Sequence, residues 1–258
     1  MYLVAIGEIF LKGKNRISFE RRLIKNIRDA LKITPNELIK FRNRYLIIKD
    51  MDVSNLKRVF GINFYVKCIK ADLDKIKDAA LSLITNEKTF RASAKKSIIL
   101  KKSSQTINEE IGDYITSKKP NIKVNLTSPE IDIKIEELSN KAFLYKASEI
   151  IKCFGGLPVE TGGFVHLKVK DEKLSTVAGF LLMKRGCVIS LSKDIELLHK
   201  FEHGFNLRIR EEKESDIVAT DETFESLDLK LDSKFTLKPL IGYTKEEINE
   251  IYDKIISL

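Results

Sequence analysis

Segments with strand-like and helix-like spacing of apolar residues alternate from the start of the chain. Tyr2–Phe10 is rich in apolar residues and predicts a strand. Ile17–Ile33 predicts an amphipathic helix, because apolar side chains such as Leu23 and Ile27 recur on one helical face. A hairpin, a short helix and a strand are predicted next, over Leu38–Phe41 and Tyr45–Lys49, Val53–Phe60, and Asn63–Ala71. This β-α-β-β-α-β order is that of a ferredoxin-like domain, which we place at residues 1–71.

A second α/β unit is predicted over residues 72–153. Asp72 can cap a helix that runs to Thr85, and a second helix is predicted over Thr106–Ser117. Strands are predicted over Thr89–Lys95, Ile131–Ile135 and Ala142–Ile150. The Gly- and Pro-rich stretch FGGLPVETGG, residues 154–163, is interpreted as a linker to a third unit.

The third unit, residues 164–258, opens with the strand FVHLKV and an apolar helix that ends at Gly186. Further strands are predicted over Val188–Ser190 and Ile217–Ala219, and Thr244 with Glu247 forms a capping box for a last helix. Roughly 95 residues are few for a parallel sheet with crossover helices, so we predict a reduced Rossmann-like sheet. The fold class predicted for the whole chain is α/β (α+β).

Charge is distributed unevenly along the 258 residues, whose formal net charge is +9. Residues 1–150 hold 30 Lys and Arg against 18 Asp and Glu, whereas residues 151–258 hold 16 against 19. A basic front part favours a polyanionic partner, and RNA or DNA is the polyanion that such a protein most often meets. The alternative is a lysine-rich surface without a partner.

Cysteine usage and hydropathy indicate the cytoplasm. The three cysteines, Cys68, Cys153 and Cys187, are far apart and odd in number, which predicts neither a disulfide framework nor a zinc site. No apolar run approaches the roughly 20 residues that span a bilayer. The N-terminal stretch carries its charges after its apolar residues and does not resemble a signal peptide.

Two basic segments are candidates for phosphate contacts. Lys12, Lys14, Asn15 and Arg16 stand between the first strand and its helix, where free N–H groups favour an anion. A solvated turn is the alternative. Arg91 and Lys95 share one face of a strand, and the neighbouring loop adds further lysines, which are Lys96, Lys101 and Lys102. The alternative there is an edge strand that lysines protect from pairing.

The turn KDEKL, residues 170–174, joins a strand to a helix where nucleotide enzymes place a glycine-rich phosphate loop. It contains no glycine and presents the carboxylates of Asp171 and Glu172. Two histidines in HKFEH, residues 199–203, have i, i+4 spacing, but without further ligands we predict no metal. Ser175 lacks the flanking glycines of a nucleophile elbow, so we predict no hydrolase triad with His166.

Several segments keep a common order between residues 7 and 186: GEIFLKGKNRISFERRL, TFRASAKKS, INEEIGDYI, EIDIKIEE, GGLPVETGG and VAGFLLMKRG. Together they resemble the tRNA 4-thiouridine synthetases, a family of tRNA sulfurtransferases also known from thiamine biosynthesis, and residues 238–255 resemble the end of its catalytic domain. The resemblance implies a ferredoxin-like domain, an RNA-binding THUMP domain and a PP-loop-type adenylation domain. It also implies a homodimer that grips the acceptor and 3′ CCA end of tRNA, adenylates a uridine with ATP and Mg²⁺, and transfers sulfur from a cysteine persulfide.

The chain departs from this family at its chemistry. The family's loop Ser-Gly-Gly-Ile-Asp-Ser aligns with Lys170, Asp171, Glu172, Lys173, Leu174 and Ser175, of which only the last serine is retained. Added Cβ atoms and two negative charges oppose a pyrophosphate there. The third unit is also shorter than the family's, and residues 199–206, where the family's catalytic cysteine is expected, contain none.

We therefore predict a tRNA-binding protein without catalytic residues, bound cofactor or metal, a pseudoenzyme whose partner performs any chemistry. One alternative is an active sulfurtransferase with divergent or partner-supplied chemistry. Another is a THUMP accessory subunit of a different tRNA-modifying enzyme.

Overall fold

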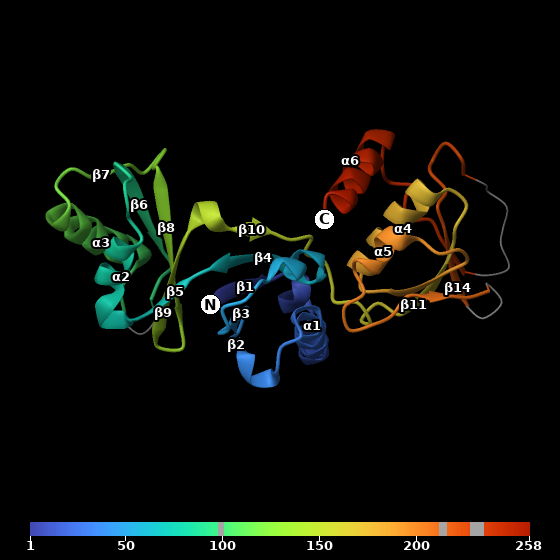
Figure 1. Cartoon of the computed structure of the whole chain (residues 1–258), viewed down its shortest axis with the longest axis horizontal. Coiled ribbons are helices and arrows are strands. Elements are labelled where there is room, and N and C mark those ends of the chain that lie inside the picture. The colour runs from blue at the N-terminus through green and yellow to red at the C-terminus, as the bar shows by residue number, and fades with distance from the viewer. Residues whose placement is uncertain (98–100, 212–215, 228–234) are drawn as a thin grey trace. The chain divides into compact units, whose positions relative to one another are not determined.

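The computed structural model describes residues 1–97, 101–211, 216–227 and 235–258 (Figure 1). Residues 1–4, 37–50 and 65–151 form one compact unit, and residues 5–36, 51–64 and 152–258 form the other. Short 3-10 turns link the elements at Glu8–Leu11, Gly13–Asn15, Pro35–Glu37, Ser54–Arg58, Leu73–Lys75 and Ala147–Glu149. Among the helices of these residues, none has the length and apolar run that crossing a bilayer requires.

The first sheet has the strand order β10-β4-β1-β3-β2. Its elements are β1 (Tyr2–Ile6), α1 (Arg16–Leu31), β2 (Leu38–Lys40), β3 (Arg44–Ile47), β4 (Ile62–Lys67) and β10 (Ile151–Lys152). The order β4-β1-β3-β2 is that of a ferredoxin-like fold, so that prediction is confirmed. Two details differ from the prediction. The second helix is only a 3-10 turn at Ser54–Arg58, and the predicted strand 63–71 is divided at Cys68, after which the chain enters another sheet.

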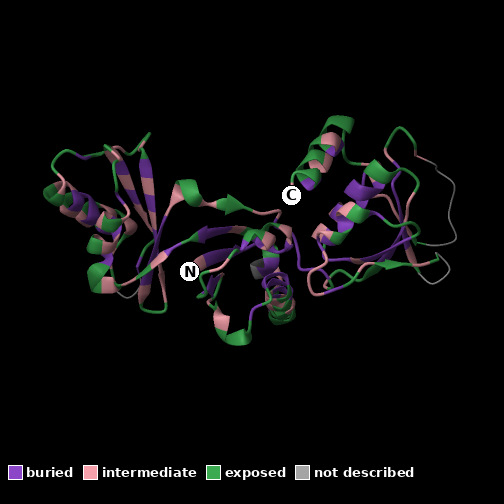
Figure 2. Ribbon diagram, in the orientation of Figure 1, coloured by how far each residue is buried: buried purple, intermediate pink, exposed green. Residues whose placement is uncertain are grey.

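The second sheet has the order β5-β9-β8-β6-β7 and lies entirely in the first unit. Its strands are β5 (Ile69–Asp72), β6 (Thr89–Ala94), β7 (Lys123–Val124), β8 (Ile131–Leu138) and β9 (Lys141–Lys146). Helices α2 (Ile76–Ser82) and α3 (Ser104–Lys118) enclose a core with this sheet that includes Phe90, Ile111 and Ile133. Burial alternates along the strands, as Figure 2 shows. Asp72 does not cap the helix as predicted, because its carboxylate is bound by Lys141 instead.

The third sheet is wholly parallel and has the order β13-β12-β11-β14-β15. Its elements are β11 (Phe164–Lys168), α4 (Glu172–Lys184), β12 (Val188–Leu191), α5 (Glu196–His199), β13 (Arg208–Ile209), β14 (Ile217–Thr220), β15 (Phe235–Leu237) and α6 (Lys245–Ile256). Leu167, Val177, Phe180 and Ile189 belong to its core. The predicted capping box of Thr244 with Glu247 is present.

The stretch 154–163, interpreted from sequence as a linker, is tightly packed in the second unit. Residues 155–159 are buried. The backbone N–H of Leu157 donates to the carbonyl of Lys184 at 2.9 Å, and the N–H groups of Thr161 and Gly162 donate to the carbonyl of Gly186. Gly156 has a φ of +78°, and a Cβ there would lie 2.3 Å from the carbonyl oxygen of Lys184. The segment therefore fixes the end of α4.

Candidate functional site

The turn between β11 and α4 carries the residues that align with a phosphate loop. Asp171 occupies the N-cap of α4, and its side chain accepts a hydrogen bond from the N–H of Leu174 at 2.8 Å. The turn thus closes the helix start with its own carboxylate, which satisfies one of the N–H groups that an anion could otherwise use.

A second carboxylate, that of Asp221, lies in the turn itself. Its Oδ2 accepts hydrogen bonds from the backbone N–H groups of Lys170 (3.1 Å) and Asp171 (2.7 Å) and from Oγ of Ser175 (2.7 Å). Asp221 is only 3% exposed. It reaches this place because β14 pairs with β11 in parallel, and Asp221 directly follows the last residue of β14. An internal anion therefore takes the donors of this turn.

The lysines beside the turn are occupied as well. Nζ of Lys170 lies 3.5 Å from a carboxylate oxygen of Glu222, and Nζ of Lys238 lies 2.6 Å from the other. The ammonium group of Lys173 lies over the ring of Tyr252, 5.1 Å from its centroid. A triphosphate placed in this turn would meet the carboxylate of Asp221, so the residues present do not fit the phosphates of ATP.

The three thiols are in surroundings that keep them protonated. Burial raises the pKa of Cys68 to about 11 and that of Cys153 to about 12, and it raises the pKa of Cys187 too. Sulfur transfer through a cysteine needs the thiolate, which is favoured near cations or helix N-termini rather than in apolar surroundings. Burial therefore favours the protonated form of all three thiols.

The two histidines of the segment 199–203 have separate surroundings in the structure. Helix α5 ends at His199, so His199 and His203 do not share a helical face. Hydrogen bonds to Asp194 (2.7 Å) and then Glu202 (2.9 Å) raise the pKa of His199. No group of three or more potential ligands occurs in the described part of the chain. Ser175 donates to Asp221, whereas Nδ1 of His166 lies 3.0 Å from Oγ of Ser190.

Three of the predicted RNA-binding cations are engaged in ion pairs in or beside the second sheet. Arg91 binds Asp132 and also donates to the carbonyl of Leu126 at 2.8 Å. Lys95 lies 2.9 Å from Glu136, and Lys102 pairs with Glu110. These cations face carboxylates supplied by β8 and α3. A phosphate would have to compete with those carboxylates.

The other residues predicted to contact RNA differ in whether their side chains interact with neighbouring residues. Arg16 pairs with Glu20 at 2.7 Å, and the ammonium of Lys12 lies over the ring of Phe19. Lys14, Asn15, Lys96 and Lys101 are exposed, and none of the three lysines has an ion-pair partner within the described ranges. The last two flank residues 98–100, which lie outside those ranges.

A basic face on α1 was not among the RNA contacts predicted from the sequence. Arg21, Lys25 and Arg28 follow one another at intervals of four and three residues, which places them on one side of the helix, and Lys32 follows at its C-cap. Arg21, Lys25 and Lys32 are exposed, and none of the three has an ion-pair partner among the residues described. The helical spacing in RRLIKNIRDALK is the signal that could have revealed this face. We call these four residues the α1 basic face.

Comparison with known proteins agrees with the fold. Residues 1–65 match the family model of the ThiI ferredoxin-like domain, and residues 70–170 match that of the THUMP domain. A probable tRNA sulfurtransferase of Mycoplasmopsis agalactiae is 35% identical over 192 residues, which are 73% of this chain and 50% of that protein. One from Geobacillus thermodenitrificans is 34% identical over 231 residues, 84% of this chain and 55% of that protein. The chain is a relative of the tRNA sulfurtransferases. It spans about half the length of these curated relatives.

Solved structures extend the comparison of the fold to the third sheet. PH1313 from Pyrococcus horikoshii superposes with a TM-score of 0.81 at 26% identity, over 100% of this chain and 99% of that one. A 4-thiouridine synthetase, solved in complex with RNA and with bound ATP, superposes with a TM-score of 0.78 at 24% identity, over 98% and 84%. This second likeness concerns the fold alone.

Proposed function

We propose that the chain binds tRNA and presents it without activating it with ATP. The absence of ATP activation is supported by the carboxylate of Asp221. It accepts hydrogen bonds from two backbone N–H groups and one hydroxyl of the turn, and a nucleotide phosphate bound there would need these same donors. A glycine-rich loop binds phosphate with free N–H groups, and here those groups are satisfied internally. The raised pKa values of Cys68 and Cys153 support the absence of a sulfur-carrying thiolate.

The tRNA-binding half rests on the matched THUMP and ferredoxin-like domains and on the exposed cations. Lys14, Lys96, Lys101 and the α1 basic face supply positive charge that no described carboxylate neutralises fully. Charge of this kind positions an RNA backbone, and shape together with the unpaired 3′ end provides selectivity. The protein acts as a homodimer in the cytoplasm and binds the acceptor end of the tRNA. A separate sulfur-relay or modifying enzyme performs the chemistry.

Binding of intact tRNA and of the same tRNA without its 3′ CCA tests the proposal over a salt series. We expect tighter binding of intact tRNA, because the unpaired end is part of the recognised shape. The logarithm of the affinity should fall with the logarithm of salt by about 0.7–0.9 per phosphate contacted. Equal, weak binding to both RNAs would contradict tRNA recognition. ATP-dependent formation of 4-thiouridine by the purified chain would instead contradict the loss of activation.

The α1 basic face should contribute to the salt dependence. The double variant Arg21→Ala/Lys25→Ala is expected to reduce the slope by about 1.4–1.8, because two phosphate contacts disappear. A matched control, Lys193→Ala/Lys245→Ala, removes two exposed lysines from the part of the chain that holds the third sheet and should leave the slope unchanged. Equal slopes for the two double variants would exclude α1 from the RNA interface.

A further inference from the structure

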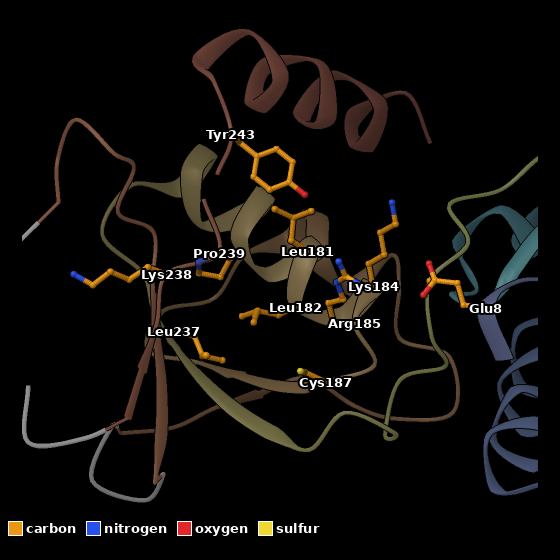
Figure 3. Close-up of a pocket in the computed structure, with 11 residues that line it drawn as sticks. Glu8, Leu181, Leu182, Lys184, Arg185, Cys187, Leu237, Lys238, Pro239 and Tyr243 are labelled. Carbon is orange, nitrogen blue, oxygen red and sulfur yellow. The ribbon is translucent and has the colours of Figure 1, made fainter. Parts of the chain in front are cut away.

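A pocket of about 510 Å³ lies in the second unit, away from the turn at 170–175. Its lining comes from the last turn of α4, the end of β15 with the two residues that follow it, Tyr243 before α6, Cys187, Gly156 and Glu8 (Figure 3). This volume is within the range of roughly 300–1,000 Å³ that is typical of small-molecule sites. None of the residues aligned with the phosphate loop contributes to it.

The walls of this pocket combine apolar side chains with a few polar groups, most of which are hydrogen-bond donors. Leu181, Leu182, Leu237 and Pro239 supply apolar surface. Figure 3 shows the side chains of Lys184 and Arg185 on the same side of the pocket, and the hydroxyl of Tyr243 directed toward Leu181. No hydrogen bond or ion pair to another described side chain engages these three polar groups. All three are hydrogen-bond donors.

The cations at the end of α4 are not needed to cap the helix. The carbonyls of Leu181, Leu182 and Met183 already accept hydrogen bonds from backbone N–H groups of residues 185–187. The carbonyl of Lys184 accepts from Leu157. Lys238, the third cation of the lining, differs because it is bound to Glu222, and its amine points away in Figure 3.

We propose that this pocket binds a small organic monoanion, in which a carboxylate, sulfonate or phosphate group is attached to a flat apolar body. The anionic group meets Lys184, Arg185 and the hydroxyl of Tyr243, and the apolar body lies against the leucines and Pro239. The carboxylate of Glu8 on the lining disfavours ligands with several negative charges, such as RNA or a triphosphate. The site therefore does not depend on tRNA binding.

A pair of matched probes tests the pocket on the full chain. The fluorescent anion 8-anilino-1-naphthalenesulfonate and its uncharged analogue N-phenyl-1-naphthylamine share the same apolar body. We expect the double variant Lys184→Ala/Arg185→Ala to weaken binding of the sulfonate at least tenfold and to change binding of the amine less than twofold. Tyr243→Phe should weaken the sulfonate severalfold, because one donor is lost.

Two further variants keep the result interpretable. Lys193→Ala removes an exposed lysine outside the pocket and should change neither affinity. Leu181→Trp fills the pocket without removing charge and should abolish binding of both probes. This variant still tests the pocket if the double variant does not fold. Sulfonate affinity that stays within twofold in the double variant, or that survives Leu181→Trp, would overturn the proposal.

Discussion

In the variant Asp221→Ala, formate and inorganic phosphate are expected to raise the stability of the protein. The same anions should leave the stability of the unmutated chain unchanged. The substitution leaves the N–H groups of Lys170 and Asp171 and the buried hydroxyl of Ser175 without their acceptor. An unsatisfied buried group costs about 1–3 kcal/mol, and because water can reach the exposed residues Lys170 and Asp171, a loss of about 1–3 kcal/mol is expected, chiefly from Ser175.

An added anion can restore the missing acceptor. Formate has the size of the carboxylate that Asp221→Ala removes, and phosphate is the ligand for which such turns are otherwise built. For a dissociation constant near 10 mM, an anion concentration of 200 mM would return about 1.8 kcal/mol. Thermal unfolding in formate or phosphate, compared with chloride at equal ionic strength, measures this recovery.

Two variants serve as controls for the anion effect. Asp194→Ala removes an exposed carboxylate from the same unit and should show no recovery. Asp221→Asn keeps an acceptor oxygen and fills the space, so it should be destabilised less and should also ignore formate. If Asp221→Ala responds to formate no more than to chloride, the turn is not an anion cradle, and the proposed reason for the loss of ATP binding fails.

The order of elements could be predicted from the sequence because it depends on local spacing. The strand of FVHLKV, the apolar helix that ends at Gly186 and the capping box of Thr244 are all found where the pattern placed them. The ferredoxin-like order followed from the succession of strand and helix signals. The sequence could not predict that the strand 63–71 divides between two sheets, because both halves have similar apolar residues.

The partners of the candidate site residues could not be predicted, because they depend on strand register. Arg91 and Lys95 do share one face of β6, as expected, but β8 pairs in parallel with that strand and places Asp132 and Glu136 within reach. In the same way, Asp221 follows a predicted strand. Its hydrogen bonds with Lys170 and Ser175 could be predicted only by knowing that β14 pairs with β11. Sequence identified the charges, and tertiary pairing decided which of them are neutralised.

Glu136 is expected to be the most stabilising carboxylate of the first unit. It is buried, and its oxygens lie 3.0 and 3.1 Å from the guanidinium of Arg44, 2.9 Å from Nζ of Lys95 and 2.8 Å from the hydroxyl of Tyr145. Glu136→Gln removes the negative charge that faces the largely buried guanidinium of Arg44. Breaking a buried pair in this way costs about 3–5 kcal/mol.

The pH dependence of this contribution has a definite sign. Burial raises the pKa of Glu136, but the charges of Arg44 and Lys95 and their hydrogen bonds outweigh it, so the pKa lies below its usual value. Its stabilisation is complete above the unfolded pKa of about 4.3 and is lost as pH falls through the lower folded value. Asp132, whose pKa is lowered to about 2, loses its contribution in the same direction.

Urea unfolding followed by circular dichroism, together with hydrogen exchange of β8 and β9, measures the effect in this unit even if the two units unfold separately. The difference between the unmutated chain and Glu136→Gln should be largest near neutral pH and should shrink below pH 4. Glu110→Gln is the matched control, because Glu110 is paired with Lys102 and Lys77 but about a third exposed. It should cost less than about 1 kcal/mol. Equal losses for the two variants would show that the pairing of Glu136 with Arg44 contributes no more than a surface ion pair.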